Sequence, residues 1–188
     1  MFHVEQSQEQ TKNINIMNKE LLKSSIRNVP DFPIKGIQFK DLTTTLKDNE
    51  ALNFIVEDLE KEFKDKGITK IVGIESRGFI IAPALAMRIG AGFVPVRKPG
   101  KLPAKTIEIE YEKEYGTDKI QIHEDAINEN DIVLIHDDLL ATGGTVKAAI
   151  ELIRQLKPQK IYTCFIVELD DLKGRDKIDA EVYSTLHF

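Results

Sequence analysis

The sequence predicts an α/β protein with a mostly parallel, twisted sheet flanked by helices. Two observations indicate this fold class. Short apolar runs typical of buried strands occur at residues 70–74, 92–96, 132–135 and 161–167, and helical stretches separate several of them. Runs that are apolar along their whole length are typical of a parallel sheet with both faces covered, since each side chain then meets a helix layer.

The N-terminal part is predicted to be an extension followed by helices. Residues 1–17 are rich in glutamine and are expected to be disordered, with Met17 as an alternative start, while residues 18–188 are expected to form one domain. Residues 19–27 fit a short amphipathic helix. A second helix is predicted where apolar residues recur three and four positions apart, at Leu52, Ile55, Val56, Leu59 and Phe63.

The remaining elements alternate as such a sheet requires. Helices are predicted at residues 78–89 and 144–156. Residues 106–111 alternate apolar and polar side chains, as a half-exposed strand does, and residues 119–122 are expected to pair with them across a turn at 115–118. The sequence contains no internal repeat and no interdomain linker.

Composition excludes several classes of protein. The chain has 188 residues, with 26 Lys and Arg against 31 Asp and Glu, and a formal net charge of −5. This balance argues against broad binding to nucleic acid, but two or three clustered cations suffice for a small phosphorylated ligand. The longest uncharged apolar run, residues 78–87, is far shorter than the roughly 20 residues of a membrane span. We therefore expect neither nucleic acid nor a membrane as a partner.

Cysteine usage and the N-terminus predict a cytoplasmic location. The single cysteine, Cys164, excludes an internal disulfide and a multi-cysteine metal site, and its apolar neighbours predict a buried thiol. Residues 1–12 lack the features of a signal peptide. No histidine has metal-ligand spacing: His136 is expected in the core, and His123 and His187 at the surface.

The strongest chemical signal follows the run at 132–135. Asp137 and Asp138 come directly after His136, and a loop of small residues then leads into a helix. Ligands bind at the carboxyl ends of strands in an open α/β sheet. Glycines let the backbone approach a ligand, and a helix N-terminus favours an anion. We therefore predict a phosphate-binding loop formed by Ala141, Thr142, Gly143, Gly144 and Thr145.

Two carboxylates beside a phosphate loop indicate a sugar phosphate. Asp137 and Asp138 repel phosphate but accept hydrogen bonds from hydroxyl groups, so the combination favours a ribose 5-phosphate. Taken singly, each feature has an ordinary explanation, because Asp138 could cap the next helix and the glycines could form a turn. No lysine follows Gly143 and Gly144, so a Walker-type nucleotide loop is a poor fit.

Several segments, in order along the chain, resemble the type I phosphoribosyltransferases, and among them the branch that acts on adenine. These segments are 32–41, 73–79, 97–103 with 111–116, 132–145, 168–169 and 172–175. The resemblance runs from about residue 26 to the C-terminus. It implies the type I phosphoribosyltransferase fold, with a small N-terminal hood and a mobile catalytic loop.

The same resemblance implies a reaction and its partners. Adenine and 5-phosphoribosyl 1-pyrophosphate would give AMP and pyrophosphate in purine salvage. Mg²⁺ would be the cofactor, bound through substrate and water, with Asp137 and Asp138 as the side chains nearest to it. These carboxylates would stabilise positive charge on the ribose. The chain would be a homodimer in which Arg97 reaches the neighbouring subunit's site.

Six residues, four of them cationic, are assigned to pyrophosphate binding by resemblance. The residues are Glu75, Ser76, Arg77, Arg97, Lys98 and Lys101. Arg77 and Lys101 would be catalytic, with Lys101 brought in as a lid closes around Pro99 and Gly100. From the residues alone, a surface ion pair between Glu75 and Arg77 explains residues 75–77 equally well. The ordinary explanation of residues 97–101 is a run of solvated charges.

The adenine site is also assigned by resemblance, to Gln38, Phe39, Lys40, Glu114 and Tyr115. Glu114 would be catalytic and assist proton movement at the imidazole edge of the purine, with Tyr115 beside it. Backbone groups of Gln38 and Lys40 would select a 6-amino group. The ordinary alternatives are a core-and-turn role for residues 38–40 and an exposed strand end for Glu114. The chain departs from the family at Lys40, where arginine is expected, and at His136, where an aliphatic residue is usual.

Three alternatives remain open from the sequence. The same fold could serve guanine, hypoxanthine, xanthine or orotate. It could also be a regulator that binds 5-phosphoribosyl 1-pyrophosphate without turnover, although the acidic chain shows no basic helix-turn-helix segment. A weaker alternative is a protein of this fold whose main role is structural association and whose turnover is minor.

Overall fold

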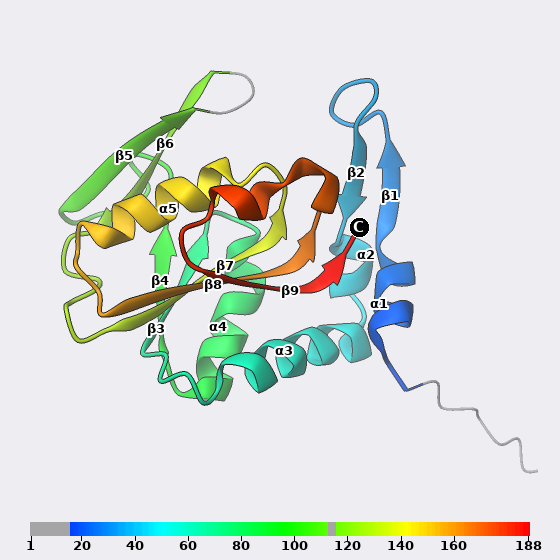
Figure 1. The fold of residues 1–188 in the computed structure, drawn as a ribbon, viewed down its shortest axis with the longest axis horizontal. Helices are drawn as coiled ribbons and strands as arrows, with labels where there is room; N and C mark the ends of the chain where they lie inside the picture. Colours follow the sequence, from blue (N-terminus) through cyan, green and yellow to red (C-terminus); the bar gives the residue numbers. More distant parts are fainter. Residues whose placement is uncertain (1–15, 113–115) are drawn as a thin grey trace, which may run out of the picture.

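The computed structural model describes residues 16–112 and 116–188, and its centre is a five-stranded parallel sheet in the order β4-β3-β7-β8-β9. The strands are β3 (Lys70–Ile74), β4 (Gly92–Val96), β7 (Ile132–Leu140), β8 (Lys160–Glu168) and β9 (Glu181–His187). Helices α3 (Asn49–Phe63) and α4 (Gly78–Ile89) cover one face, and α5 (Gly144–Arg154) covers the other (Figure 1). The predicted α/β class with a mostly parallel sheet is confirmed.

Both faces of the sheet are buried because helices cover each of them, and successive side chains of a strand point alternately into the two cores. On β3, Ile71 packs in the layer of α3 and α4, and Val72 packs in the layer of α5. On β7, Leu134 and Val133 divide in the same way. This arrangement explains why these strands are apolar along their length.

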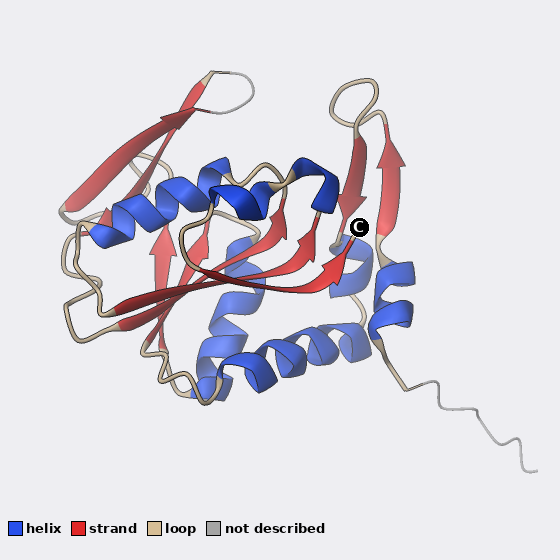
Figure 2. Ribbon diagram, in the orientation of Figure 1, coloured by secondary structure: helices blue, strands red, loops and turns tan. Residues whose placement is uncertain are grey.

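Two antiparallel ribbons project on the side of the sheet where the strands end (Figure 2). The first pairs β1 (Arg27–Pro30) with β2 (Gln38–Asp41), between α1 (Lys19–Ser25) and α2 (Thr43–Leu46); we call residues 19–46 the hood. The second pairs β5 (Thr106–Glu112) with β6 (Thr117–His123), which confirms the predicted hairpin. The carboxyl ends of the central strands therefore lie between two ribbons.

Some element bounds differ from those predicted. The predicted strand 132–135 continues to Leu140 and includes both aspartates, because β8 pairs with β7 as far as Glu168 whereas β3 pairs with it only as far as His136. The predicted helix 19–27 ends at Ser25, since Arg27 already pairs in β1. The predicted helix 144–156 ends at Arg154.

The N-terminal extension predicted over residues 1–17 falls largely outside the described residues. Met17 is described, and its side chain packs against the core that contains Leu22 of α1. Over residues 16–112 and 116–188, none of the helices combines the length and apolar character needed to cross a membrane.

Candidate active site

The two aspartates lie in the last part of β7 and differ in their contacts. Asp138 is 2% exposed, and its Oδ2 lies 3.2 Å from Nε of Arg77. Asp137 Oδ1 accepts a hydrogen bond of 2.9 Å from the backbone N–H of Asp138. Burial raises the pKa of both carboxyls, and the neighbouring Asp138 raises that of Asp137 further. Asp138 Oδ1 is buried without a hydrogen-bond partner among the described residues, so this pair can accept donors from a ligand.

The predicted phosphate loop joins β7 to α5 and surrounds a small cavity of about 190 Å³, which we call the loop cavity. Gly143 has a φ of +79°, in the left-handed region that glycine adopts without strain. Helix α5 begins at the next residue, Gly144, and Gly144 and Thr145 line the cavity, so the N-terminus of the helix, with its unpaired N–H groups, lies at the cavity. The cavity is lined by Arg77, Asp137, Leu139, Leu140, Ala141, Thr142, Gly143, Gly144, Thr145, Val146 and Phe165.

Arg77 occupies the turn between β3 and α4, in the segment predicted to bind pyrophosphate. The Glu75–Ser76 peptide bond in this turn is cis, and Ser76 is exposed. A Cβ on Gly78 would lie 2.6 Å from the carbonyl oxygen of His136, so glycine is needed for α4 to begin directly against β7. Arg77 is thereby held beside the acidic pair.

Glu75 does not pair with Arg77, contrary to the surface ion pair that the sequence left open. Its carboxylate instead contacts Arg97 at 3.2 and 3.3 Å and accepts a hydrogen bond of 2.7 Å from the backbone N–H of Lys98. Burial by itself would raise the pKa of Glu75, but these donors outweigh it and lower the pKa. Glu75 therefore anchors the loop that follows β4, residues 97–101, which we call the basic loop.

A second small cavity, the ribbon cavity, lies between this anchor and the β5–β6 ribbon. Its volume is about 130 Å³. The Nζ of Lys98 lies 2.9 Å from Asp118, and this bond is the main reason why the pKa of Lys98 is raised. Lys101 is exposed and lines none of the described cavities at the site. The ribbon cavity is lined by Ile74, Glu75, Arg77, Lys98, Tyr111, Asp118, Ile120, Asp137 and Thr145.

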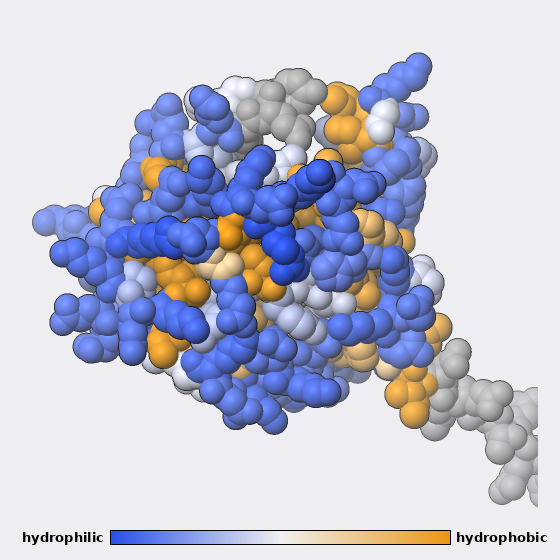
Figure 3. Space-filling model, viewed as in Figure 1, coloured by the Kyte–Doolittle hydropathy of each residue, from blue (hydrophilic) through white to orange (hydrophobic). Residues whose placement is uncertain are grey.

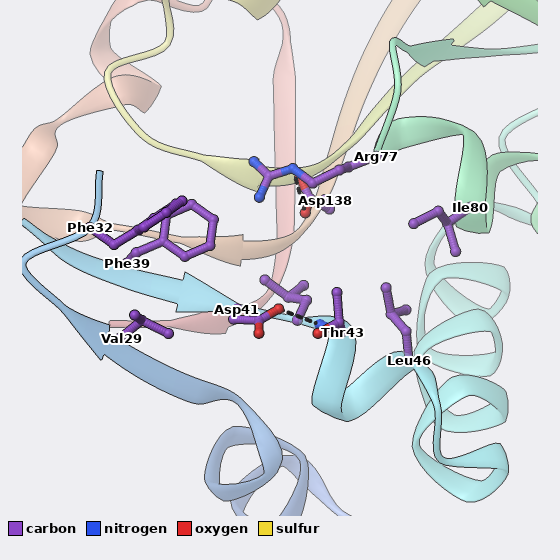
Figure 4. Close-up of a pocket in the computed structure, with 10 residues that line it drawn as sticks. Val29, Phe32, Phe39, Asp41, Thr43, Leu46, Arg77, Ile80 and Asp138 are labelled. Atoms are coloured by element: carbon purple, nitrogen blue, oxygen red, sulfur yellow. Dashed lines mark hydrogen bonds and ion pairs between the residues drawn. The ribbon is translucent and has the colours of Figure 1, made fainter. Parts of the chain in front are cut away.

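The third and largest cavity, the apolar cavity, lies between the hood and α4 and has a volume of about 420 Å³. Figure 4 shows the Arg77 side chain between Asp138 and the rings of Phe32 and Phe39. The two rings pack edge to face at 5.1 Å, and the guanidinium lies 5.7 Å from the Phe39 ring centre. The cavity is lined by Val29, Phe32, Phe39, Asp41, Leu42, Thr43, Leu46, Arg77, Ile80 and Asp138.

Predicted adenine-site residues are distributed unevenly around this cavity. Phe39 lines it, whereas the side chain of Gln38 accepts a hydrogen bond from Asn28 and the Nζ of Lys40 lies 4.4 Å from the Phe188 ring centre. Glu114 and Tyr115 lie outside the described residues.

Most of the apolar wall was not predicted as a site. Val29, Phe32, Leu46 and Ile80 come from three separate parts of the chain, and apolar residues in short strands and helices are usually core. Phe32 stands at the start of the segment 32–41, which was the one available signal.

The three histidines within the described residues, and the cysteine, line none of these three cavities. His136 is buried with Nδ1 at 3.2 Å from the carbonyl oxygen of Cys164, and burial lowers its pKa to about 4, which confirms a core histidine. Burial raises the pKa of the Cys164 thiol. His187 contacts Asp170 at the surface, as predicted, whereas Nε2 of His123 is buried and has no partner among residues 16–112 and 116–188.

Comparisons with known proteins identify the family. Residues 43–187 match the phosphoribosyl transferase domain. An adenine phosphoribosyltransferase of Bacteroides thetaiotaomicron is 61% identical over 173 residues, covering 91% of this chain and 98% of that protein. The chain belongs to the adenine phosphoribosyltransferase family.

Solved structures of adenine phosphoribosyltransferases have the same fold. The enzyme of Thermoanaerobacter pseudethanolicus is 48% identical and superposes with a TM-score of 0.87, covering 91% of this chain and 100% of that one. The Saccharomyces cerevisiae enzyme, solved with adenine and an imino-altritol bisphosphate, is 42% identical with a TM-score of 0.84, covering 89% and 98%. The predicted type I phosphoribosyltransferase fold is thus confirmed, and the chain is an enzyme of the pentosyltransferase class.

Proposed function

We propose that the chain transfers the 5-phosphoribosyl group of 5-phosphoribosyl 1-pyrophosphate to adenine, with AMP and pyrophosphate as products, in purine salvage. One observation carries the assignment to these cavities: three cavities of different chemistry meet at Arg77. The apolar cavity suits a purine, the loop cavity suits the 5-phosphate, and the ribbon cavity suits the pyrophosphate. The acidic pair, Asp137 and Asp138, lies between them, where the ribose must be.

The acidic pair supports transfer through a ribose that carries positive charge at C1′. When the bond to pyrophosphate breaks, the sugar becomes oxocarbenium-like, and nearby carboxylates stabilise it electrostatically. Asp137 and Asp138 also accept hydrogen bonds from the ribose hydroxyls. In their ionised form these carboxylates interact with a positive charge that is present only in the transition state, so they stabilise it more than the uncharged ribose of the ground state.

The leaving pyrophosphate is proposed to be bound by the cations around the ribbon cavity. Arg77, Lys98 and Glu75 line it, and Ser76 lies between Glu75 and Arg77 in the β3–α4 turn. Lys101 joins when the basic loop, residues 97–101, moves from the position held by Glu75, and Arg97 then reaches the pyrophosphate site of the neighbouring subunit. Closure of this loop would exclude water, which otherwise consumes the activated sugar.

The base is proposed to lie in the apolar cavity against Phe39. A planar purine stacks favourably on an aromatic ring. Because the side chains of Gln38 and Lys40 are engaged elsewhere, their backbone groups are the part of β2 left to recognise the 6-amino group. We assign Glu114 to proton movement at the imidazole edge, with Tyr115 beside it, by similarity to the family.

Mg²⁺ fits the donor set of this site. The acidic pair offers hard oxygen ligands, including the buried and unpartnered Oδ1 of Asp138, and Mg²⁺ retains several waters when it binds. The chemistry that Mg²⁺ would supply is neutralisation of negative charge on the pyrophosphate. Asp137 and Asp138 are the residues that would hold it, in addition to accepting hydrogen bonds from the ribose.

A homodimer is proposed from an apolar surface beside the site. Ile80 and Met87 lie seven residues apart on one side of α4 and are 49% and 85% exposed, and Phe93 on the edge strand β4 is 38% exposed. Such a surface on the edge of a sheet favours a protein interface. Sedimentation at micromolar concentration tests it, and a monomer would contradict both the dimer and the entry of Arg97 into a neighbouring site.

We further propose that residues 18–188 form one domain and that the enzyme is cytoplasmic. Leu22 of the hood shares a core with α3, α4 and the sheet, which supports a single folding unit. The one cysteine is buried and free, as in proteins of reducing compartments. Cooperative unfolding in a single transition tests the first proposal, and fractionation of the native cells tests the second.

A competition assay tests the reaction itself. The enzyme is given Mg²⁺, 5-phosphoribosyl 1-pyrophosphate and an equimolar mixture of labelled adenine, guanine, hypoxanthine, xanthine and orotate, and nucleotide products are counted. We expect AMP as the dominant product. Preference for a 6-oxopurine or for orotate would overturn the base assignment, and binding of 5-phosphoribosyl 1-pyrophosphate without turnover would favour a regulator.

A further inference from the structure

The phosphate loop has a backbone neighbour that the proposed mechanism does not use. This neighbour is Gly174, the first residue of the 3-10 helix η2 (Gly174–Lys177). A Cβ on Gly174 would lie 2.1 Å from the carbonyl oxygen of Ala141, and a Cβ on Gly143 would lie 2.5 Å from the carbonyl oxygen of Gly174. Both contacts join backbone to backbone. Neither position has room for a methyl group unless one backbone moves.

Gly174 is held in place by the residue that follows it. Arg175 donates from Nε and Nη2 to the two carboxylate oxygens of Glu168, at 2.9 and 2.6 Å, and from Nη1 to the carbonyl oxygen of Val182 at 2.8 Å. The hydroxyl of Ser184 donates to the same carboxylate at 2.6 Å. A bidentate arginine–carboxylate pair fixes orientation as well as distance. Arg175 therefore ties η2 to β8 and β9.

The Arg175–Glu168 pair lies at the carboxyl end of the sheet, next to the start of the phosphate loop. Glu168 is the last residue of β8, is 4% exposed and pairs in register with Leu140, the last residue of β7. The next N–H, of Leu169, donates to the carbonyl oxygen of Leu140 at 2.9 Å. One short span of sheet therefore supports both Gly174 and the loop against which it packs.

The charge on Glu168 is stabilised by these donors. Burial alone would raise its pKa, but the hydrogen bonds from Arg175 and Ser184 outweigh this effect and the pKa is lowered. Glu168 also lies with Asp170 and His187 in a group close enough to hold a metal ion. Because both Glu168 oxygens already accept bonds from Arg175, the group is better described as an anchor than as a metal site.

We propose that Gly174 and the Arg175–Glu168 pair are positioning residues for the phosphate loop. They hold Ala141 and Gly143 so that the N–H groups of the loop remain directed at the 5-phosphate. The inference rests on the proposed function of the loop cavity. None of these residues touches the reacting atoms, so their effect should fall on one substrate and not on the other.

The test compares Gly174→Ala and Arg175→Lys with the wild-type enzyme in steady-state kinetics. For Gly174→Ala we expect the KM for 5-phosphoribosyl 1-pyrophosphate to rise on the order of 100-fold, since a displacement near 1 Å has effects of that size. For Arg175→Lys, which keeps the charge but loses the fork, we expect a rise of roughly tenfold. The KM for adenine should not change in either variant.

The matched control is Arg154→Lys, which alters an exposed Arg–Asp pair with Asp179 away from the loop. It should leave both KM values unchanged. Unchanged KM values in Gly174→Ala and Arg175→Lys would overturn the proposal, and so would a rise of both KM values in parallel with a loss of thermal stability. If Gly174→Ala does not fold, Arg175→Lys decides.

A binding measurement separates this inference from the proposed function. Calorimetry with ribose 5-phosphate needs no turnover and no base. Weaker binding by Arg175→Lys than by Arg154→Lys supports the anchor even if adenine is not the base. Equal binding by the two variants would overturn it, whatever the enzyme's activity.

Discussion

The loop cavity and the apolar cavity meet at Arg77, yet they are built in different ways. The loop cavity is formed at the carboxyl end of β7, where Gly143 and Gly174 press backbone against backbone. The apolar cavity has side-chain walls, and one of them belongs to the hood, whose ribbon is paired only with itself. Figure 3 shows apolar side chains gathered at the tip of that ribbon, where Phe32 and Ile34 are half exposed.

The difference indicates a division of tasks. A phosphate is recognised by directed N–H groups, so its site needs a backbone that cannot move, and the sheet supplies one. A flat apolar base is recognised largely by contact, so its wall can come from a less supported element. We therefore expect changes on the two sides to affect different kinetic constants.

The largest effect is expected where the two sides join. Asp138→Asn keeps the shape of the side chain but removes the charge that faces Arg77 and, in the proposed mechanism, the ribose, and kcat should fall on the order of 100- to 1,000-fold. Arg77→Ala should also abolish most turnover. Because the two groups contact each other, the double variant should lose less than the product of the single losses. Adenine-dependent pyrophosphate release measures all three.

The matched control for the charge is Asp179→Asn, an exposed aspartate paired with Arg154. It should retain full activity. If both Asp138→Asn and Arg77→Ala fold and keep wild-type turnover, the acidic pair and Arg77 have no role in the mechanism. The loop cavity and the apolar cavity would then not be two halves of one active site.

A smaller effect is expected from the apolar side. Phe39→Ala removes the ring that packs against Phe32 and Arg77, and the KM for adenine should rise roughly tenfold, in line with the value of one stacked base. The KM for 5-phosphoribosyl 1-pyrophosphate should stay unchanged, which is the reverse of the pattern expected for Gly174→Ala. Phe39→Tyr, which keeps the ring, should restore the wild-type value. If Phe39→Ala instead changes the KM for 5-phosphoribosyl 1-pyrophosphate, the loop cavity and the apolar cavity are not independent.

The last prediction concerns the stability of the fold around β7 and leaves the kinetic constants aside. The pKa of His136 is about 4 in the folded chain, below its value near 6.5 when unfolded, so the unfolded state binds the extra proton first. Its contribution to the free energy of unfolding is therefore complete above pH 6.5 and is lost as pH falls toward 4, by about 3 kcal/mol.

Urea unfolding of the wild type and His136→Leu between pH 7.5 and 4.5 isolates this histidine, because the other titrating groups are common to both proteins. The wild type should lose stability relative to the variant as pH falls. A difference between the two proteins that stays constant with pH would mean that His136 is not held neutral by burial.

Sequence reasoning predicted the central layers and the position of the glycine loop between β7 and α5 because both depend on local patterns. The run at 70–74 is apolar after Lys70, and the structure has β3 over these same residues. β7 was predicted too short because Asp137 and Asp138 are rarely placed inside a buried strand, and only pairing with β8 extends it that far. The strands β1, β2 and β9 were not predicted, since their residues do not form a clear apolar run.

The sequence by itself determined the fold class, the position of the acidic pair beside a glycine loop, and the burial of Cys164 and His136. Only the tertiary structure decided that Arg77 pairs with Asp138 and Arg97 with Glu75, and that Phe32 and Ile80 line one cavity. The physical reason is range: periodicity and turn chemistry act over a few neighbouring residues. Ion pairs and cavity walls join segments that strand order and packing bring together, and no local pattern encodes which segments these are.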